Sequence, residues 1–262
     1  MKKKRLYFGL LNLLFLFIGA QVYGQQADQD TVGSSQEFQA PSLGKKDYDA
    51  RGEEIKYPRS YGGLTFTRID WGFSRLIDKG GFSLRNQNQF LSYKKASNFG
   101  FDIAQFGLRF NDASKVYISA GFEWNYLRLK KDVILDSETT PLSYHLSDIP
   151  YQKNILTTTY LRLPLSYEWR GKRQYLNARP KIAAGIMTGF LLKGTQRLKS
   201  QEEGKQKFKD DYHFAKFQYG AFARVGLGSF GLFAKYYLND FIQDSPQQEN
   251  LHNFTFGLTL GF

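Results

Sequence analysis

The sequence predicts an all-β protein: an eight-stranded antiparallel transmembrane β-barrel of the outer-membrane type, preceded by a flexible N-terminal tail. Three observations lead to this fold. In the last predicted strand, 251–262, the residues from Phe254 to Phe262 alternate large apolar with small or polar side chains and stop on a phenylalanine. Aromatic residues make up 17% of the chain, although the mean hydropathy is only -0.46. Segments of alternating hydrophobicity recur between turn signals, which is the pattern of strands placed between lipid and a lumen.

Residues 1–24 have the order of a cleaved signal peptide. A basic start, Lys2 to Arg5, precedes an apolar run from Leu6 to Ala20 and then small residues up to Gly24. The run is shorter than the roughly 20 residues that a spanning helix needs, so a retained helix is the weaker alternative. We expect cleavage near Gly24. The chain contains no cysteine, which excludes a lipoprotein anchor, disulfides and thiol catalysis.

Residues 25–61 are rich in Gln, Asp, Gly and Ser and show no sustained period, which predicts a flexible periplasmic tail. The barrel is then expected over 62–262. Its eight predicted strands are 64–77, 97–111, 115–130, 154–170, 175–197, 213–227, 230–241 and 251–262.

The predicted connections alternate in length. Tight turns at 111–114, 171–174 and 228–229 alternate with long polar connections at 78–96, 131–153, 198–212 and 242–250. A barrel with both termini in the periplasm has short turns on that side and long loops outside. We therefore expect a protein of the outer membrane of a Gram-negative bacterium, with both termini periplasmic. A soluble eight-stranded barrel is the alternative.

Alternation assigns the two faces of each strand. The outward rows are expected to be Val116, Ile118, Ala120, Phe122, Trp124 and Tyr126; Leu161, Leu163, Leu165, Tyr167 and Trp169; and Phe217, Tyr219, Ala221, Ala223, Val225 and Leu227. The lumen is expected to hold Arg68, Asp70, Glu123, Arg162, Glu168, Lys181, Lys216, Arg224 and Lys235. In 97–111 the apolar residues change parity, which predicts a bulge near Ala104.

Several segments resemble the PorT-like outer-membrane β-barrel family of Bacteroidota. They are Thr158–Leu165, with its tyrosine, leucine and proline order, the glycine-spaced Ile182–Gly189, Tyr219–Gly226, and the closing Phe256–Phe262. The resemblance spans about Gly62 to Phe262. It implies an integral outer-membrane protein, usually without an assigned activity. The member that gave the family its name belongs to a type IX secretion system, but no motif here carries that role over.

The lumen of an eight-stranded barrel is just wide enough for side chains to fill. The charges predicted inside therefore indicate a structural hydrogen-bonded network, with a path for protons or small ions as the alternative. His145, His213 and His252 all fall near the long loops, with Asp210, Asp211, Asp240, Asp244 and Ser245 nearby. They lack ligand spacing and a nucleophile motif, so we expect no catalytic site, metal or cofactor.

Basic residues concentrate around the long connection 198–212. Its candidate contacts for lipid phosphate are Lys193, Arg197, Lys199, Lys205, Lys207 and Lys209. A solvated loop is the equal alternative. No recognition helix or stacking platform supports nucleic-acid binding despite the net charge of +12.

We therefore expect a monomeric barrel, not an enzyme, with a side-chain-filled lumen and a structural or interaction role through its extracellular loops. Its expected partners are outer-membrane lipid, lipopolysaccharide among it, and a periplasmic or extracellular protein. Two alternatives stay open: a component of a secretion or envelope complex of the type IX kind, and a lipid-modifying or proteolytic enzyme of the outer membrane.

Overall fold

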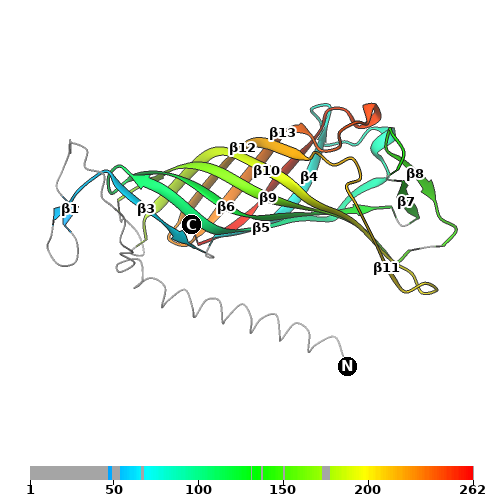
Figure 1. The fold of residues 1–262 in the computed structure, drawn as a ribbon, viewed down its shortest axis with the longest axis horizontal. Coiled ribbons are helices and arrows are strands. Elements are labelled where there is room, and N and C mark those ends of the chain that lie inside the picture. Colours follow the sequence, from blue (N-terminus) through cyan, green and yellow to red (C-terminus); the bar gives the residue numbers. More distant parts are fainter. Residues whose placement is uncertain are drawn as a thin grey trace, which may run out of the picture. The chain divides into compact units, whose positions relative to one another are not determined.

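The computed structural model describes residues 47–48, 54–65, 68–130, 132–136, 138–149, 151–172 and 178–261, and nearly all of them form strands or their connections (Figure 1). The expected signal peptide and most of the expected tail lie outside the described residues. The chain divides into two compact units, Met1–Tyr57 and Pro58–Phe262. In the first, β1 (Asp47–Tyr48) pairs with β2 (Glu54–Ile55).

The second unit is a closed eight-stranded antiparallel β-barrel, as predicted. Each strand pairs with its neighbours along the chain, and the pairing of β14 with β4 closes the ring. The eight strands are β4 (Ile69–Asp78), β5 (Leu91–Arg109), β6 (Ser114–Leu129), β9 (Lys153–Arg170), β10 (Pro180–Lys199), β12 (Phe217–Leu227), β13 (Phe230–Asp240) and β14 (Leu251–Leu260). Within the described residues, no helix is long and apolar enough to cross a membrane.

The predicted first strand, 64–77, corresponds to β4, and a further strand precedes it. This strand, β3 (Arg59–Leu64), pairs with the second half of β5, whereas β4 pairs with residues 97–101 of β5. The place where β5 changes partner from β4 to β3 coincides with the predicted bulge, which the structure confirms as a register shift between Asp102 and Ala104 in the pairing of β5 with β6. The boundary expected between tail and barrel, at residue 61, therefore falls inside a strand.

At the long-loop end several strands differ from prediction. β5 begins at Leu91 instead of 97, and β10 runs on to Lys199 in a hairpin with β11 (Lys205–Asp210). β12 begins at Phe217 instead of 213, because Tyr212 and His213 have positive φ angles of 48° and 55° and interrupt the extended chain. The connections at this end also hold β7 (Val133–Asp136), β8 (Ser143–Leu146), η1 (Asn86–Asn88) and η2 (Pro246–Gln248).

At the short-turn end β10 begins at Pro180, not 175, and residues 173–177 lie outside the described part. The two faces of the barrel wall follow the predicted alternation. On β9, Leu165, Tyr167 and Trp169 are exposed, while Ser166 and Glu168 between them are buried. All six predicted outward residues of β12 are exposed. The wall therefore presents an apolar outer surface, as a lipid-facing barrel requires.

Candidate functional site: a charged lumen, an apolar plug and a basic outer face

Arg162 lies at the centre of a buried ion cluster in the lumen. From β9 its guanidinium reaches across the lumen to β4 and β5, with Nη1 2.8 Å from Oδ2 of Asp70 and Nη2 2.7 Å from Oδ1 of Asp102. Nη1 also lies 3.6 Å from Oε2 of Glu123. Gly100 makes room for it, because a Cβ at this position would stand 2.6 Å from Nη1. One cation therefore holds three carboxylates from β4, β5 and β6.

Two further cations complete this cluster from the opposite wall. Arg224 Nη2 on β12 donates to Asp70 Oδ2 at 2.9 Å, and Lys235 Nζ on β13 lies 3.0 Å from the same oxygen. Lys235 also donates to Glu123 Oε2 at 2.9 Å, and the hydroxyl of Tyr237 donates to Oε1 of Glu123 at 2.7 Å. The cluster thereby joins strands from all sides of the barrel.

A second group of charges surrounds Glu168, nearer the short turns. Lys115 Nζ lies 3.2 Å from Glu168 Oε1, Arg170 Nε donates to that oxygen at 2.7 Å, and the Tyr117 hydroxyl donates to Oε2 at 3.2 Å. Arg68 lies over the ring of Tyr117 at 4.8 Å and donates to Asp102 at 3.2 Å. Arg68 thus links the two groups into one network.

The structure brings seven of the nine residues expected in the lumen into these contacts, all but Lys181 and Lys216. Lys181 shares the inward side of β10 with Ala183, but it is only half-buried, at the end of the strand near the short turns. Lys216, also expected inside, is exposed because β12 begins one residue later. The prediction missed Asp102, Lys115 and Arg170. Asp102 adjoins the bulge, where parity changes, whereas Lys115 shares the parity of Glu123 and could have been found.

Above the ions lies a layer of amides and hydroxyls. Ser74 Oγ donates to Asn253 Oδ1 at 2.9 Å, and Asn98 Nδ2 donates to Asn125 Oδ1 at 2.8 Å. Asn125 Nδ2 in turn donates to Thr158 Oγ1 at 3.3 Å. This layer bridges strands from β4 round to β9 and satisfies polar groups that would be costly to bury alone.

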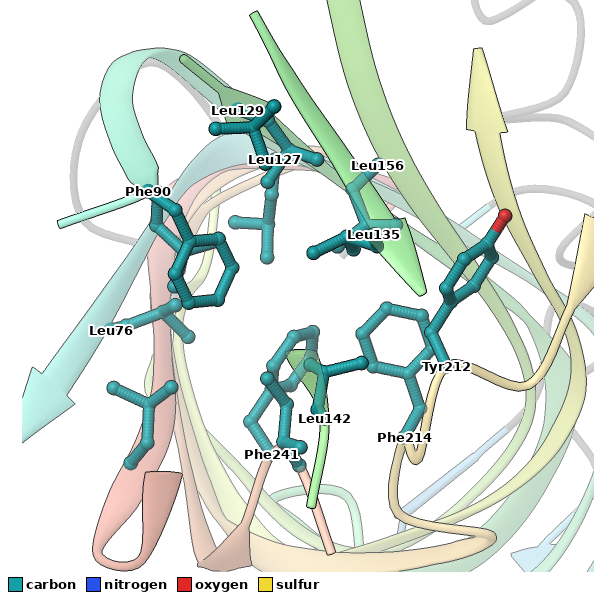
Figure 2. Close-up of a cluster of buried hydrophobic side chains, with 14 of the residues drawn as sticks. Leu76, Phe90, Leu127, Leu129, Leu135, Leu142, Leu156, Tyr212, Phe214 and Phe241 are labelled. Atoms are coloured by element: carbon teal, nitrogen blue, oxygen red, sulfur yellow. The ribbon is translucent and has the colours of Figure 1, made fainter. Parts of the chain in front are cut away.

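The next side chains that face the lumen, two residues closer to the long loops, are apolar on four of these strands. Ser74 is followed by Leu76, Asn125 by Leu127 and, on strands of opposite direction, Thr158 by Leu156 and Asn253 by Leu251. Loop residues join these leucines in one buried cluster, the apolar plug (Figure 2). Its members from outside the barrel strands are Phe90, Val133, Leu135, Leu142, Tyr212, Phe214, Phe241 and Ile242.

The plug lies at the long-loop end of the barrel, and its side chains are almost completely buried. Leu76, Leu156 and Leu251 expose at most 1% of their surface, and Phe214 exposes 1%. Figure 2 shows Leu76, Leu156 and Phe214, with other labelled members of the plug, arranged around a common centre. The connections contribute eight of the described residues to this cluster and the barrel strands seven. Burial of the plug therefore holds the described parts of the long connections against the end of the barrel, and we call these parts the cap.

The three histidines lie at separate places in this cap. His213 Nε2 lies 3.0 Å from the carbonyl oxygen of Thr139, and His252 Nε2 lies 4.0 Å from Asp240. His145 is exposed on β8. Ser245, which was expected near the histidines, is buried, and its Oγ accepts a hydrogen bond from the Leu142 amide at 3.1 Å. Among the described residues, no group of three or more His, Asp or Glu side chains is placed to hold a metal ion.

The basic residues around 198–212 lie together on the outer side of the β10–β11 hairpin. A register shift between Leu191 and Lys193 changes the parity of β10, so that Lys193, Arg197 and Lys199 face outward beyond it. Their cross-strand partners include Lys207 opposite Arg197 and Lys205 opposite Lys199.

The family of outer membrane protein beta-barrel domains matches residues 60–243. This range covers well over half of the chain. The protein belongs to this family. The match begins in β3 and ends just after β13, so this outer-membrane barrel supplies its last strand, β14, beyond the matched range. A search of curated proteins finds no match for the chain.

Proposed function

We propose that this outer-membrane barrel is a closed structural or interaction protein that works through its ordered cap outside the cell, with both termini in the periplasm after removal of a signal peptide. The apolar plug carries the proposal. Ions crossing the lumen would have to leave water and pass a layer of packed leucine and phenylalanine side chains, where an unpaired charge is very costly.

The charged layer below the plug supports the same conclusion. Each of the acids Asp70, Asp102 and Glu123 contacts more than one cation, and Arg162 and Arg224 are fully buried. Charges held in such contacts stabilise a fixed arrangement instead of leaving sites vacant for permeating ions. We therefore favour the structural interpretation of the lumen charges over an ion path.

The cap offers an ordered surface for a partner. All four residues of β8 are exposed, including the apolar Tyr144 and Leu146, while β7 beside it contributes Val133 and Leu135 to the plug. Tyr144 stands opposite Leu135, and Leu146 stands opposite Val133, so all four share one face of the hairpin. The exposed pair therefore forms an apolar rim beside the plug, with the ring of Tyr144 5.2 Å from that of Phe90. An extracellular protein is the partner that this surface suits, since large exposed apolar groups on ordered loops favour protein contacts.

The resemblance to PorT-like proteins of Bacteroidota keeps a role in a secretion or envelope complex as the second candidate. The segments that carry the resemblance lie in the barrel wall, and a role of this kind would use the periplasmic tail. A pull-down with and without residues 25–57 separates the two candidates, because only the complex role needs the tail.

The closed state is tested with the purified protein in planar lipid bilayers. We expect no stepwise current from the wild type, and sustained single-channel conductance would overturn the proposal. The interaction role is tested in a deletion strain complemented with the Tyr144→Ser, Leu146→Ser variant. We expect loss of the wild-type envelope phenotype at normal surface abundance, whereas the matched control Glu138→Gln, also exposed in the cap, retains it.

A further inference from the structure

Cations form cross-strand rows on the outer side of the sheet extension made by β9, β10 and β11. Lys153, Lys199 and Lys205 pair in one row across three strands. In the next row, Arg197 stands between Ile155 and Lys207. We call this surface the basic face; its residues are Lys153, Lys193, Arg197, Lys199, Lys205, Lys207 and Lys209. Lys153 was not among the residues expected from the sequence.

The basic face concentrates like charges at short range. Residues directly opposite on neighbouring antiparallel strands have Cβ atoms about 4.5–5.5 Å apart, and like charges there are destabilising. The pKa of the Lys207 amino group is lowered, first by the charge of Lys193 and also by those of Arg197 and Lys209. These side chains therefore repel one another in the absence of an anion.

Two acidic residues border this face at one end, where Asp210 and Asp211 line a hollow together with Lys193 and Lys209. Asp210 pairs with Gly194, so it falls on the opposite parity of β11 from Lys207 and Lys209. Among the described residues, no ion pair of the structure involves a side chain of the basic face. Because the cross-strand rows contain cations and no carboxylate, binding of an external anion would relieve their mutual repulsion.

The basic face begins where the lipid-facing surface ends. Phe190 and Leu192 on β10 are exposed apolar residues, and the ring of Phe190 lies 5.2 Å from that of Phe217 in the adjoining strand. Aromatic residues of this kind mark the boundary between hydrocarbon and head groups in membrane barrels. Lys193 follows Leu192 directly, and Arg197 and Lys199 continue outward at about 3.4 Å per residue.

We propose that the basic face binds the phosphate groups of phosphorylated glycolipid in the outer leaflet of the membrane. The inference rests on the proposed function, because it needs the long-loop end to lie outside the cell. Lys and Arg both bind phosphate, Lys as a point charge and Arg as a fork that holds two oxygens. Cations spread along β10 at successive heights match phosphates attached at more than one depth of a glycolipid head group.

The test uses the purified full-length barrel in detergent micelles and native mass spectrometry with three probes: diphosphorylated lipid A, dephosphorylated lipid A and inorganic phosphate. We expect the diphosphorylated lipid to bind and the dephosphorylated lipid to bind weakly. The variant Arg197→Gln, Lys199→Gln, Lys207→Gln removes three cations, and the loss of each should weaken binding of the diphosphorylated lipid about fivefold. We therefore expect about a hundredfold loss.

A matched control neutralises three exposed lysines elsewhere, in Lys79→Gln, Lys95→Gln, Lys172→Gln. Its lipid affinity should equal that of the wild type. Heat modifiability in gel electrophoresis reports that each variant is folded. Equal binding of both lipids, an unaffected triple variant, or displacement of the lipid by equimolar inorganic phosphate would each overturn the proposal.

A second measurement separates this inference from the proposed function. A cysteine placed at the exposed Gln201, in the tip of the β10–β11 hairpin, is labelled with an impermeant reagent on intact cells. Labelling with failed lipid binding overturns the glycolipid proposal alone. Absence of labelling on cells, with labelling after lysis, overturns the orientation and with it both proposals.

Discussion

Replacement of Arg162 by methionine tests the lumen network at its centre. The guanidinium makes contacts of 2.7 Å to Asp102, 2.8 Å to Asp70 and 3.6 Å to Glu123, and all four side chains are fully buried. In the variant, Asp70 and Glu123 retain their contacts with Lys235, whereas Asp102 retains only the 3.2 Å contact with Arg68. Breaking a buried pair on one side costs about 3–5 kcal/mol, so we expect a loss of that size in unfolding free energy.

The assay is reversible urea unfolding in lipid bilayers, followed by tryptophan fluorescence. The double variant Arg162→Met, Asp102→Asn removes the stranded charge together with its partner, and it should recover most of the lost free energy. Arg197→Met on the basic face serves as the exposed control and should change stability by less than about 0.5 kcal/mol. A single variant as stable as the control, or a double variant no better than the single, would refute the reasoning.

Three other predictions concern the wall, the plug and a turn. Leu163→Arg on the lipid face should cost about 2–4 kcal/mol in the same bilayer assay, while Ser166→Asn, facing the lumen, costs much less; equal penalties would overturn the assignment of faces. Leu156→Ala should cost about 2–5 kcal/mol and speed hydrogen exchange of the loops that contact the plug; unchanged exchange would show that the plug does not hold the cap. Arg179 donates two hydrogen bonds to Asp112 and holds the pKa of this carboxyl below its usual value. The resulting stability is present above about pH 4 and is lost as the pH falls through the lowered pKa. Asp112→Asn should therefore cost stability at pH 7 but not in strong acid, by less than about 1 kcal/mol because the pair is partly exposed.

Alternation of side chains was sufficient to predict the barrel, because a strand between lipid and lumen has a different solvent on each side. Leu165, Tyr167 and Trp169 were assigned to the outside on this basis alone, and all three are exposed. The parity change in β5 likewise revealed its bulge. Sequence reasoning was less successful at strand ends, where pairing partners instead of local pattern decide the boundary. β3 is a strand because it pairs with β5, although its own residues read as tail.

The candidate sites were likewise predictable within regular strands and not beside bulges or register shifts. Charges in the middle of regular strands, such as Arg162 and Arg224, were assigned to the lumen from parity. Asp102 was missed because the bulge beside it makes its side ambiguous. The basic face was recognised as a set of residues, but its rows depend on the register shift at Leu192, which reverses the sides of β10 and has no signal in the local sequence.

The plug has a consequence for how the two ends of the barrel respond to temperature. Its leucines and phenylalanines are removed from water and not from lipid, so their contribution carries the heat-capacity signature of a soluble protein core. The outer wall, already in hydrocarbon, lacks most of that signature. Cooling should therefore loosen the cap selectively while the membrane-embedded strands stay paired, and a protein of this design would present its outer loops most rigidly in warm surroundings.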